Sequence, residues 1–133
     1  MTQAFADTSF YVALVNPRDA LHAAATELAE TFRGAIVTTE YVLLEAANWL
    51  ARSGDRQVFI ELLRQIRADR RTTVVSGSST LFERGFDLYS RRQDKDWSLT
   101  DCISFDVMRE HGLAEAMTAD HHFEQAGFTV LLK

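Results

Sequence analysis

The chain has a single cysteine and a single proline among its 133 residues. Because Cys102 alone cannot form an intramolecular disulfide, the sequence favours a reducing, cytoplasmic compartment. With one proline and no low-complexity tract, we expect neither a linker nor an internal repeat, and therefore one domain over residues 1–133. No basic residue precedes the first apolar stretch and Asp7 interrupts it, so this stretch resembles neither a signal peptide nor a membrane span.

Several common site patterns are also missing. The sequence has no Cys/His cluster with zinc-binding spacing and no glycine-rich phosphate loop, which argues against an NTPase or a dinucleotide-binding protein. Ser9, Ser98 and Ser104 lack a convincing histidine partner, so a nucleophilic triad is not supported. His22 and His111 have no carboxylate neighbour at a useful spacing, and we assign them no role. These absences leave acidic side chains as the main candidates for chemistry.

The charge of the chain is unevenly distributed. The net charge of −5 by itself argues against a nucleic-acid partner, and a hydrophobic content of 47% is typical of a globular protein with a full core. Residues 52–95, however, carry ten basic residues against six acids, whereas the remainder has a net charge of −9. Arg64, Arg67 and Arg71 share one helical face there. That face either binds phosphates or forms a solvated, salt-bridged surface, and the sequence leaves both open.

Hydrophobic periodicity and capping residues predict five strands that alternate with helices. The strands are expected at 3–6, 35–37, 72–75, 114–118 and 128–132. The helices are expected at 7–16, 20–32, 40–52, 54–70, 79–91, 99–111 and 121–125. This order predicts an α/β fold with a mostly parallel central sheet and helices on both of its faces.

Four acids occupy positions that matter in such a sheet, because parallel sheets place their sites at the carboxyl ends of the strands. Asp7 directly follows the first strand, and Asp120 lies just beyond the fourth. Glu45 is on the helix that leaves the second strand. Asp101 lies on the helix that leads into the fourth strand, so its position is less constrained. We therefore expect at least three acids at one edge of the sheet.

Each of these acids also has a structural explanation. Asp7 would suit a helix N-cap, and Asp101 would complete a capping box with Ser98. Glu45 lies in an otherwise apolar helical stretch, so we expect it in or beside the core. Four acids at one edge would nevertheless repel one another, and a bound Mg²⁺ or Mn²⁺ ion removes that conflict. Next to a phosphodiester, such an ion can polarise a phosphoryl oxygen and activate water for in-line attack.

Four segments together resemble the PIN-domain ribonucleases, and in particular the toxins of bacterial VapBC toxin–antitoxin modules. They are DTSF at 7–10, the helix with Glu45 and Asn48, WSLTDCISF at 97–105 and TADHHFEQAGF at 118–128. The resemblance spans nearly the whole chain in order. It implies a three-layer α/β/α sandwich and Mg²⁺- or Mn²⁺-dependent RNA cleavage, with water as the nucleophile and a 5′-phosphate product.

The resemblance also implies roles for individual side chains. An acidic quartet is implied to bind the metal and carry catalysis: Asp7, Glu45, Asp101 and Asp120. Hydroxyls are implied to orient water at the ion, although they are also common helix caps: Thr8 or Ser9, and Ser104. Asp106 does not match the pattern and is interpreted as a surface acid.

Two other pairs of residues are interpreted as structural. For His121 and His122 we favour turn and packing roles over catalysis. Trp49 and Trp97 are interpreted as core anchors rather than platforms for base stacking, because stacking requires an exposed ring.

The implied partners are an RNA substrate (tRNA, rRNA or mRNA), a cognate antitoxin and a second copy of the chain, with no membrane partner. The antitoxin's C-terminal segment would lie across the acidic groove and insert an arginine into the carboxylates. Two alternatives remain open. One is a free-standing PIN-domain nuclease for RNA processing, and the other is an inactive scaffold that binds RNA or protein.

Overall fold

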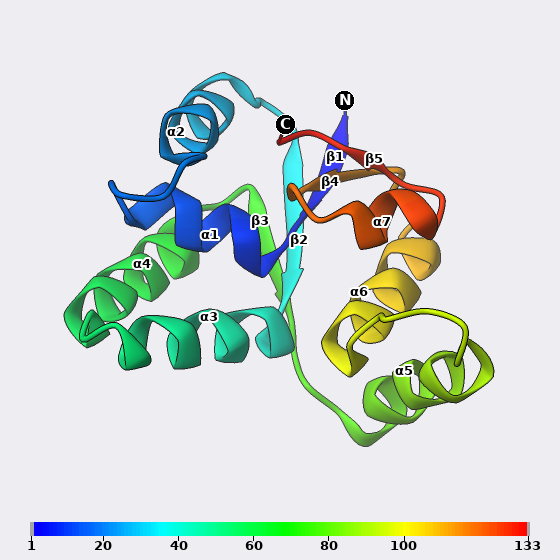
Figure 1. The fold of residues 1–133 in the computed structure, drawn as a ribbon. Helices are drawn as coiled ribbons and strands as arrows, with labels where there is room; N and C mark the ends of the chain where they lie inside the picture. Colours follow the sequence, from blue (N-terminus) through cyan, green and yellow to red (C-terminus); the bar gives the residue numbers. More distant parts are fainter. Residues whose placement is uncertain (1, 133) are drawn as a thin grey trace.

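Five strands form the central layer of the computed structural model, which describes residues 2–132 (Figure 1). They are β1 (Gln3–Ala6), β2 (Ala35–Thr39), β3 (Thr72–Val75), β4 (Glu115–Met117) and β5 (Thr129–Val130). Their order in the sheet is β3-β2-β1-β4-β5, and each neighbouring pair is parallel. The predicted parallel sheet is therefore confirmed, with β1 at its centre.

Seven helices cover the two faces of this sheet. They are α1 (Thr8–Val15), α2 (His22–Thr31), α3 (Glu40–Arg52), α4 (Arg56–Ala68), α5 (Ser79–Arg91), α6 (Leu99–Glu110) and α7 (His121–Gln125). Helices α1 to α4 lie on one side of the sheet and α5 to α7 on the other, which confirms the three-layer α/β/α sandwich (Figure 1). Within the described residues, no helix combines the length and the hydropathy needed to cross a bilayer.

The α6 helix is fixed firmly in the core, and this matters because it carries Asp101. The ring of Phe105 meets Trp97 and Phe123 edge to face, at centroid distances of 5.0 and 4.9 Å. The α5 helix approaches α6 closely at Gly85, where an added Cβ would lie 2.2 Å from Cγ1 of Ile103. Trp97 is 4% exposed, so its predicted role as a core anchor is confirmed.

The α3 helix differs from the prediction. Its apolar sequence suggested burial on nearly all sides, yet only one face packs into the core, through Val42, Leu43, Ala46 and Leu50. The side chains of Leu44, Glu45 and Trp49 are exposed instead. The prediction that Trp49 anchors the core is therefore wrong, and Glu45, expected in or beside the core, lies on the exposed side of the helix. An apolar composition predicts burial only when a second layer covers the other face of the helix, and none covers α3 here.

Candidate active site

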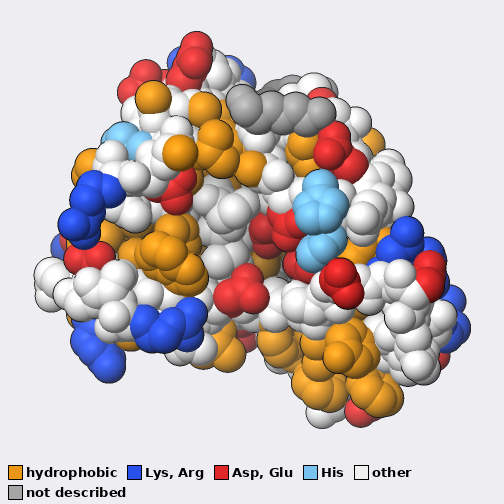
Figure 2. Space-filling view, in the orientation of Figure 1, with side chains coloured by type: hydrophobic (Ala, Val, Ile, Leu, Met, Phe, Trp, Pro, Cys, Tyr) orange, Lys and Arg blue, Asp and Glu red, His pale blue; other side chains and the backbone are white. Residues whose placement is uncertain are grey.

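The four predicted acids line one groove of about 510 Å³, beside the carboxyl ends of β1, β2 and β4. Figure 2 shows acidic and histidine side chains gathered in the hollow between the two halves of the molecule. Each acid comes from a different element, since Asp7 follows β1, Glu45 is on α3, Asp101 is on α6 and Asp120 follows β4. The fold thus brings together side chains that are more than a hundred residues apart in sequence.

Asp7 is the most buried of these acids, with 5% of its surface exposed. It occupies the N-cap position of α1 but makes no side-chain cap hydrogen bond. Instead its Oδ2 accepts a hydrogen bond of 2.9 Å from the hydroxyl of Thr118. Burial is the main cause that raises the pKa of Asp7 from 3.8 to about 7, and the charges of Asp101 and Glu45 raise it further. A cation in the groove would reverse this destabilisation of the carboxylate.

Asp101 both caps α6 and faces the groove. It completes the capping box of α6, because its backbone N–H donates to Ser98 Oγ while its Oδ2 accepts from the Ser98 backbone N–H. The same Oδ2 lies 3.1 Å from Nδ1 of His122. Burial, with the charge of Asp120 added to it, raises the pKa of Asp101. The cap therefore fixes the position of a carboxylate that also faces the groove.

Glu45 reaches the groove from the exposed side of α3. Its Oε1 accepts a short hydrogen bond of 2.5 Å from the hydroxyl of Thr8, the residue that follows Asp7. This contact ties the start of α1 to α3, whose N-cap is Thr39. The side chain of Glu45 is exposed, so this carboxylate reaches solvent at the edge of the helix while it lines the groove.

His122 lies among the acids, a contact that the sequence did not predict. Its Nδ1 lies 3.1 Å from Asp101 Oδ2 and 3.3 Å from Asp120 Oδ1, between acids of two different elements. The ligand atoms of Asp120, His121 and His122 all lie within 4.8 Å of one another, whereas Asp7 is not part of that group in the described residues.

A small network of hydroxyls supports the groove. Thr118 donates to Asp7, accepts from the backbone N–H of Asp120 at 3.0 Å and lies 2.9 Å from Ser9 Oγ. Thr8 and Ser9 line the groove, as expected for the hydroxyls that the resemblance implies. Ser104 is different, because it is fully buried, does not line the groove, and its Oγ has no hydrogen-bond partner in the described residues.

The residues present fit a divalent metal ion. The donors are carboxylate and hydroxyl oxygens, which Mg²⁺ and Mn²⁺ prefer. Asp7 is 5% exposed, and burial raises its pKa, so its charged form would be stabilised by a cation in the groove. Within residues 2–132, one arginine, Arg52, and no lysine lines the groove. The six carboxylates that line it are those of Asp7, Asp19, Glu45, Asp96, Asp101 and Asp120.

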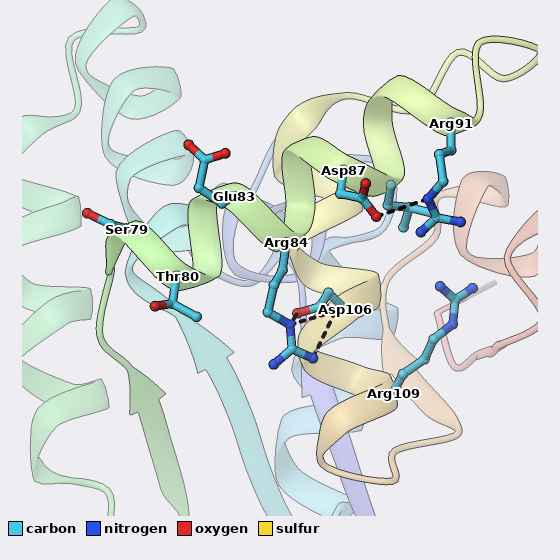
Figure 3. Close-up of a pocket in the computed structure, with 9 residues that line it drawn as sticks. Ser79, Thr80, Glu83, Arg84, Asp87, Arg91, Asp106 and Arg109 are labelled. Atoms are coloured by element: carbon cyan, nitrogen blue, oxygen red, sulfur yellow. Dashed lines mark hydrogen bonds and ion pairs between the residues drawn. The ribbon is translucent and has the colours of Figure 1, made fainter.

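A second cavity of about 590 Å³ lies between α5 and α6, and it lacks such an imbalance (Figure 3). Its charged side chains pair with each other, since Arg84 contacts Asp106 at 3.0 Å and Arg91 contacts Asp87 at 3.0 Å. Asp106, expected as a surface acid, is partly buried in this ion pair. Its three arginines and three acids balance, so this cavity is the weaker candidate for a metal site.

The single helical face predicted for Arg64, Arg67 and Arg71 is wrong for Arg71, because α4 ends at Ala68 and Arg71 lies in the turn before β3. Arg64 pairs with Glu61 at 2.6 Å, and Arg71 pairs with Asp69 at 3.5 Å. None of the arginines of that face lines the groove. The Arg64–Glu61 and Arg71–Asp69 pairs are of the kind found on a solvated, salt-bridged surface.

Besides the contacts of His122, sequence reasoning missed the supporting role of Thr118 and the positions of Trp49 and Arg52 at the groove. Thr118 is visible in the sequence only as part of the quoted TAD motif, and its bond to Asp7 depends on the pairing of β1 with β4. Trp49 and Arg52 follow Glu45 by four and seven residues on α3, a spacing that places all three on one helical face. That spacing was a signal, but the assumed burial of α3 concealed it.

Comparisons with known proteins agree with this geometry. The family model of the PIN domain matches residues 4–129. The chain is 32% identical to the "23S rRNA-specific endonuclease VapC20" of Mycobacterium tuberculosis. The alignment extends over 124 residues, which are 93% of this chain and 94% of that protein. The crystal structure of that protein, described as a sarcin–ricin loop cleaving toxin, superposes with a TM-score of 0.87 at 30% identity, covering 95% of this chain and 96% of the other. A toxin–antitoxin complex from Klebsiella pneumoniae shares the fold, with a TM-score of 0.61 at 20% identity over 89% of this chain and 87% of that one. The chain belongs to the PIN-domain family.

Proposed function

We propose that this protein is a Mg²⁺- or Mn²⁺-dependent endoribonuclease that acts as the toxin of a toxin–antitoxin pair, in one domain spanning residues 1–133. The observation that carries the proposal is the convergence of four acids from four elements in one groove: Asp7, Glu45, Asp101 and Asp120. The similarity to an rRNA-specific endonuclease over 93% of the chain supports RNA as the substrate. An rRNA loop is accordingly the first substrate to test, and the cytoplasm is the compartment that we expect.

The chain prepares its carboxylates before any substrate arrives. Thr118 holds Oδ2 of Asp7, the capping box holds Asp101, and Thr8 holds Glu45. These hydrogen bonds restrict side chains that would otherwise turn away from one another in a metal-free groove. The four acids would hold the ion, with Ser9 and Thr8 near enough to orient water in the groove. When bound, the divalent ion supplies positive charge that polarises the phosphoryl group and lowers the pKa of the attacking water.

The test is cleavage of purified rRNA and of a short stem–loop from it, with Mg²⁺, Mn²⁺ or EDTA. We expect cleavage with either ion, products that carry a 5′-phosphate, and no cleavage in EDTA. Asp101→Asn keeps the shape of the side chain but removes its charge, and it should abolish cleavage. Asp106→Asn, in the second cavity, is the matched control and should cleave normally. Equal cleavage by wild type and Asp101→Asn would show that the activity is a contaminant or that the site is wrong.

The antitoxin is proposed to insert an arginine between the acids, where a guanidinium forms paired hydrogen bonds with carboxylates. The excess of carboxylates in the groove supports this idea. Co-expression with the product of a small neighbouring gene should give a complex in which Mn²⁺ no longer binds. A complex that leaves the groove empty would contradict the proposal, and the absence of any such gene would favour a free-standing RNA-processing nuclease.

A homodimer is also proposed. The α5 helix exposes three aromatic side chains that are 42% to 48% exposed: Phe82, Phe86 and Tyr89. The rings of Phe86 and Tyr89 stack at a centroid distance of 6.4 Å and form part of an apolar patch. Sedimentation velocity should show a dimer that Phe86→Ser weakens, whereas a monomer over the whole concentration range would contradict it.

A further inference from the structure

Trp49 is exposed at the rim of the acidic groove. It is 41% exposed, although a tryptophan is usually covered in a folded protein. The side chain is one of those that line the groove, together with the four acids. A tryptophan can stack on a base only if its ring is exposed, and the ring of Trp49 is exposed in the structure.

Glu45, Trp49 and Arg52 form a row along α3. Positions four and seven residues apart lie on one face of a helix, about one and two turns from the first residue. All three side chains line the same groove. The row thus runs from a proposed metal ligand, past an exposed aromatic ring, to a guanidinium group.

Arg52 is electrostatically unusual in this place. Among the described residues that line the groove, it carries the only arginine or lysine charge, against six carboxylates. No ion pair or hydrogen bond of its side chain is found in the described part of the chain, unlike Arg64 and Arg84. A polyanion that enters an acidic groove needs a cation to bind its phosphates away from the metal, and Arg52 is the one available.

From this row we infer a binding subsite for one unpaired nucleotide of the RNA next to the cleaved phosphate. This inference rests on the proposed ribonuclease function and deepens it. The base stacks on the ring of Trp49, and a phosphate of the same strand binds the guanidinium of Arg52. In a double helix, both faces of a base are covered by its neighbours. A free face therefore selects single-stranded loops over duplexes.

An unpaired base and a neighbouring phosphate account for the aromatic ring and the guanidinium together. A protein partner would have to bring a further carboxylate to Arg52 in a groove that already holds six, whereas an RNA strand carries a phosphate at every nucleotide. The patch on α5, by contrast, has stacked aromatic rings and does not line the groove. We therefore assign the α3 row to RNA.

Tryptophan fluorescence tests this subsite directly, in EDTA so that the RNA stays intact. Trp97 is buried, so quenching by an added RNA reports the environment of Trp49. An eight-nucleotide unpaired RNA should quench the signal, while the same sequence in a blunt duplex should bind on the order of tenfold more weakly. Equal binding of the two RNAs would overturn the selectivity for unpaired segments.

Matched variants separate the contribution of the Trp49 ring to RNA binding from general effects on the protein, such as a change of oligomeric state. Trp49→Leu should weaken binding of the unpaired RNA on the order of tenfold, measured by fluorescence anisotropy of a labelled RNA, and Trp49→Phe should recover most of the loss. Phe82→Leu removes an exposed ring on α5 and should bind as wild type does. In cleavage assays, Trp49→Leu should raise KM much more than it lowers kcat. Wild-type affinity in Trp49→Leu, or a change only in its oligomeric state, would overturn the proposal.

Arg52→Gln should reduce the slope of log affinity against log salt by about 0.7, the value for one phosphate contact on a single strand. Arg33→Gln also removes one exposed charge, but near the opposite end of β2, and should leave that slope unchanged. An unchanged slope in Arg52→Gln would refute the phosphate contact. Binding is measured without metal and is therefore independent of cleavage. If the wild type cleaves RNA but Trp49→Leu binds RNA as tightly as the wild type, only this inference is wrong. A protein that binds but never cleaves fails only the proposed function.

Discussion

Replacing Asp7 by Asn should stabilise the metal-free protein while abolishing its activity. Asp7 is 5% exposed, and burial with the charges of Asp101 and Glu45 raises its pKa from 3.8 to about 7. The native state therefore holds the proton of Asp7 more tightly than the unfolded state. Asn has the same shape, stays neutral at every pH, and can still accept the hydrogen bond from Thr118.

The expected size follows from the shift in pKa. A shift of about three units corresponds to about 4 kcal/mol, which is an upper limit because the native state can relax around the charge. Between pH 3.8 and about 7, the free energy of unfolding of the wild type should fall relative to Asp7→Asn. Above that range the difference should stay constant. The raised pKa of Asp101 gives both proteins a further loss of stability in the same direction, so only their difference is diagnostic.

Urea unfolding followed by circular dichroism at pH 4, 6 and 8 in EDTA measures this difference. A second series with Mn²⁺ should reverse the order, because the ion stabilises the wild type and the variant lacks one of its ligands. Equal stability of the two proteins at pH 8 in EDTA would refute the reasoning, as would a greater stability of the wild type. Unchanged stabilisation of Asp7→Asn by Mn²⁺ would exclude Asp7 as a metal ligand.

Asp69→Asn is a matched control with the opposite sign. Burial tends to raise the pKa of Asp69, but hydrogen bonds from Thr72 and Arg71 outweigh it, and the pKa of Asp69 is lowered. A lowered pKa stabilises the native state above the unfolded pKa and loses this effect as the pH falls. Asp69→Asn should therefore be less stable than the wild type at pH 8, with a difference that diminishes toward pH 3.

Three further variants test the supports of the groove. Thr118→Val removes the hydroxyl that holds Asp7 and should lower the free energy of unfolding at pH 8 by about 1–3 kcal/mol. Calorimetry should show weaker Mn²⁺ binding by this variant. Unchanged Mn²⁺ binding would show that Thr118 does not position Asp7 for the ion. Ser98→Ala removes the N-cap of α6 and should cost about 1 kcal/mol in urea unfolding, whereas no loss would show that the capping box is dispensable. Gly85→Ala forces a Cβ against Ile103 and should cost about 1–3 kcal/mol. Ile103→Ala removes the side chain that the new Cβ meets, so the variant with both changes should lose less stability than the sum of the two single variants. Losses that simply add would show that the two residues do not touch.

Local sequence patterns determined the secondary structure and the order of its elements. Each predicted helix and strand is present, because capping residues and hydrophobic periodicity act over only a few neighbours. The boundaries are less well determined. The α2 helix begins at His22 rather than near Ala20, because Asp19 closes a turn by accepting a hydrogen bond from the backbone N–H of Leu21. Strand β5 covers only Thr129–Val130 of the predicted five residues, since its length depends on the short partner strand β4.

The alternation of strands and helices also determined which acids would come near one another. Parallel strands end at the same edge of a sheet, so Asp7 and Asp120 had to lie close together once the sheet was parallel. The sequence further showed that Asp101 could cap α6, and the structure adds that the cap and the groove use the same carboxylate. A capping box is a local feature, whereas a neighbour such as His122 depends on how α6 and α7 pack.

Only the tertiary structure decided which side chains are exposed. Trp97 and Trp49 had the same interpretation from the sequence, as core anchors, but Phe105 packs against the ring of Trp97 while Trp49 is 41% exposed. Burial depends on the layer that a helix meets, and local sequence does not specify that layer. For the same reason, Glu45 proved to be exposed, and Trp49 and Arg52 proved to share its groove. The sequence determined the acids and their elements, while the packing of distant layers decided how the groove around them is lined.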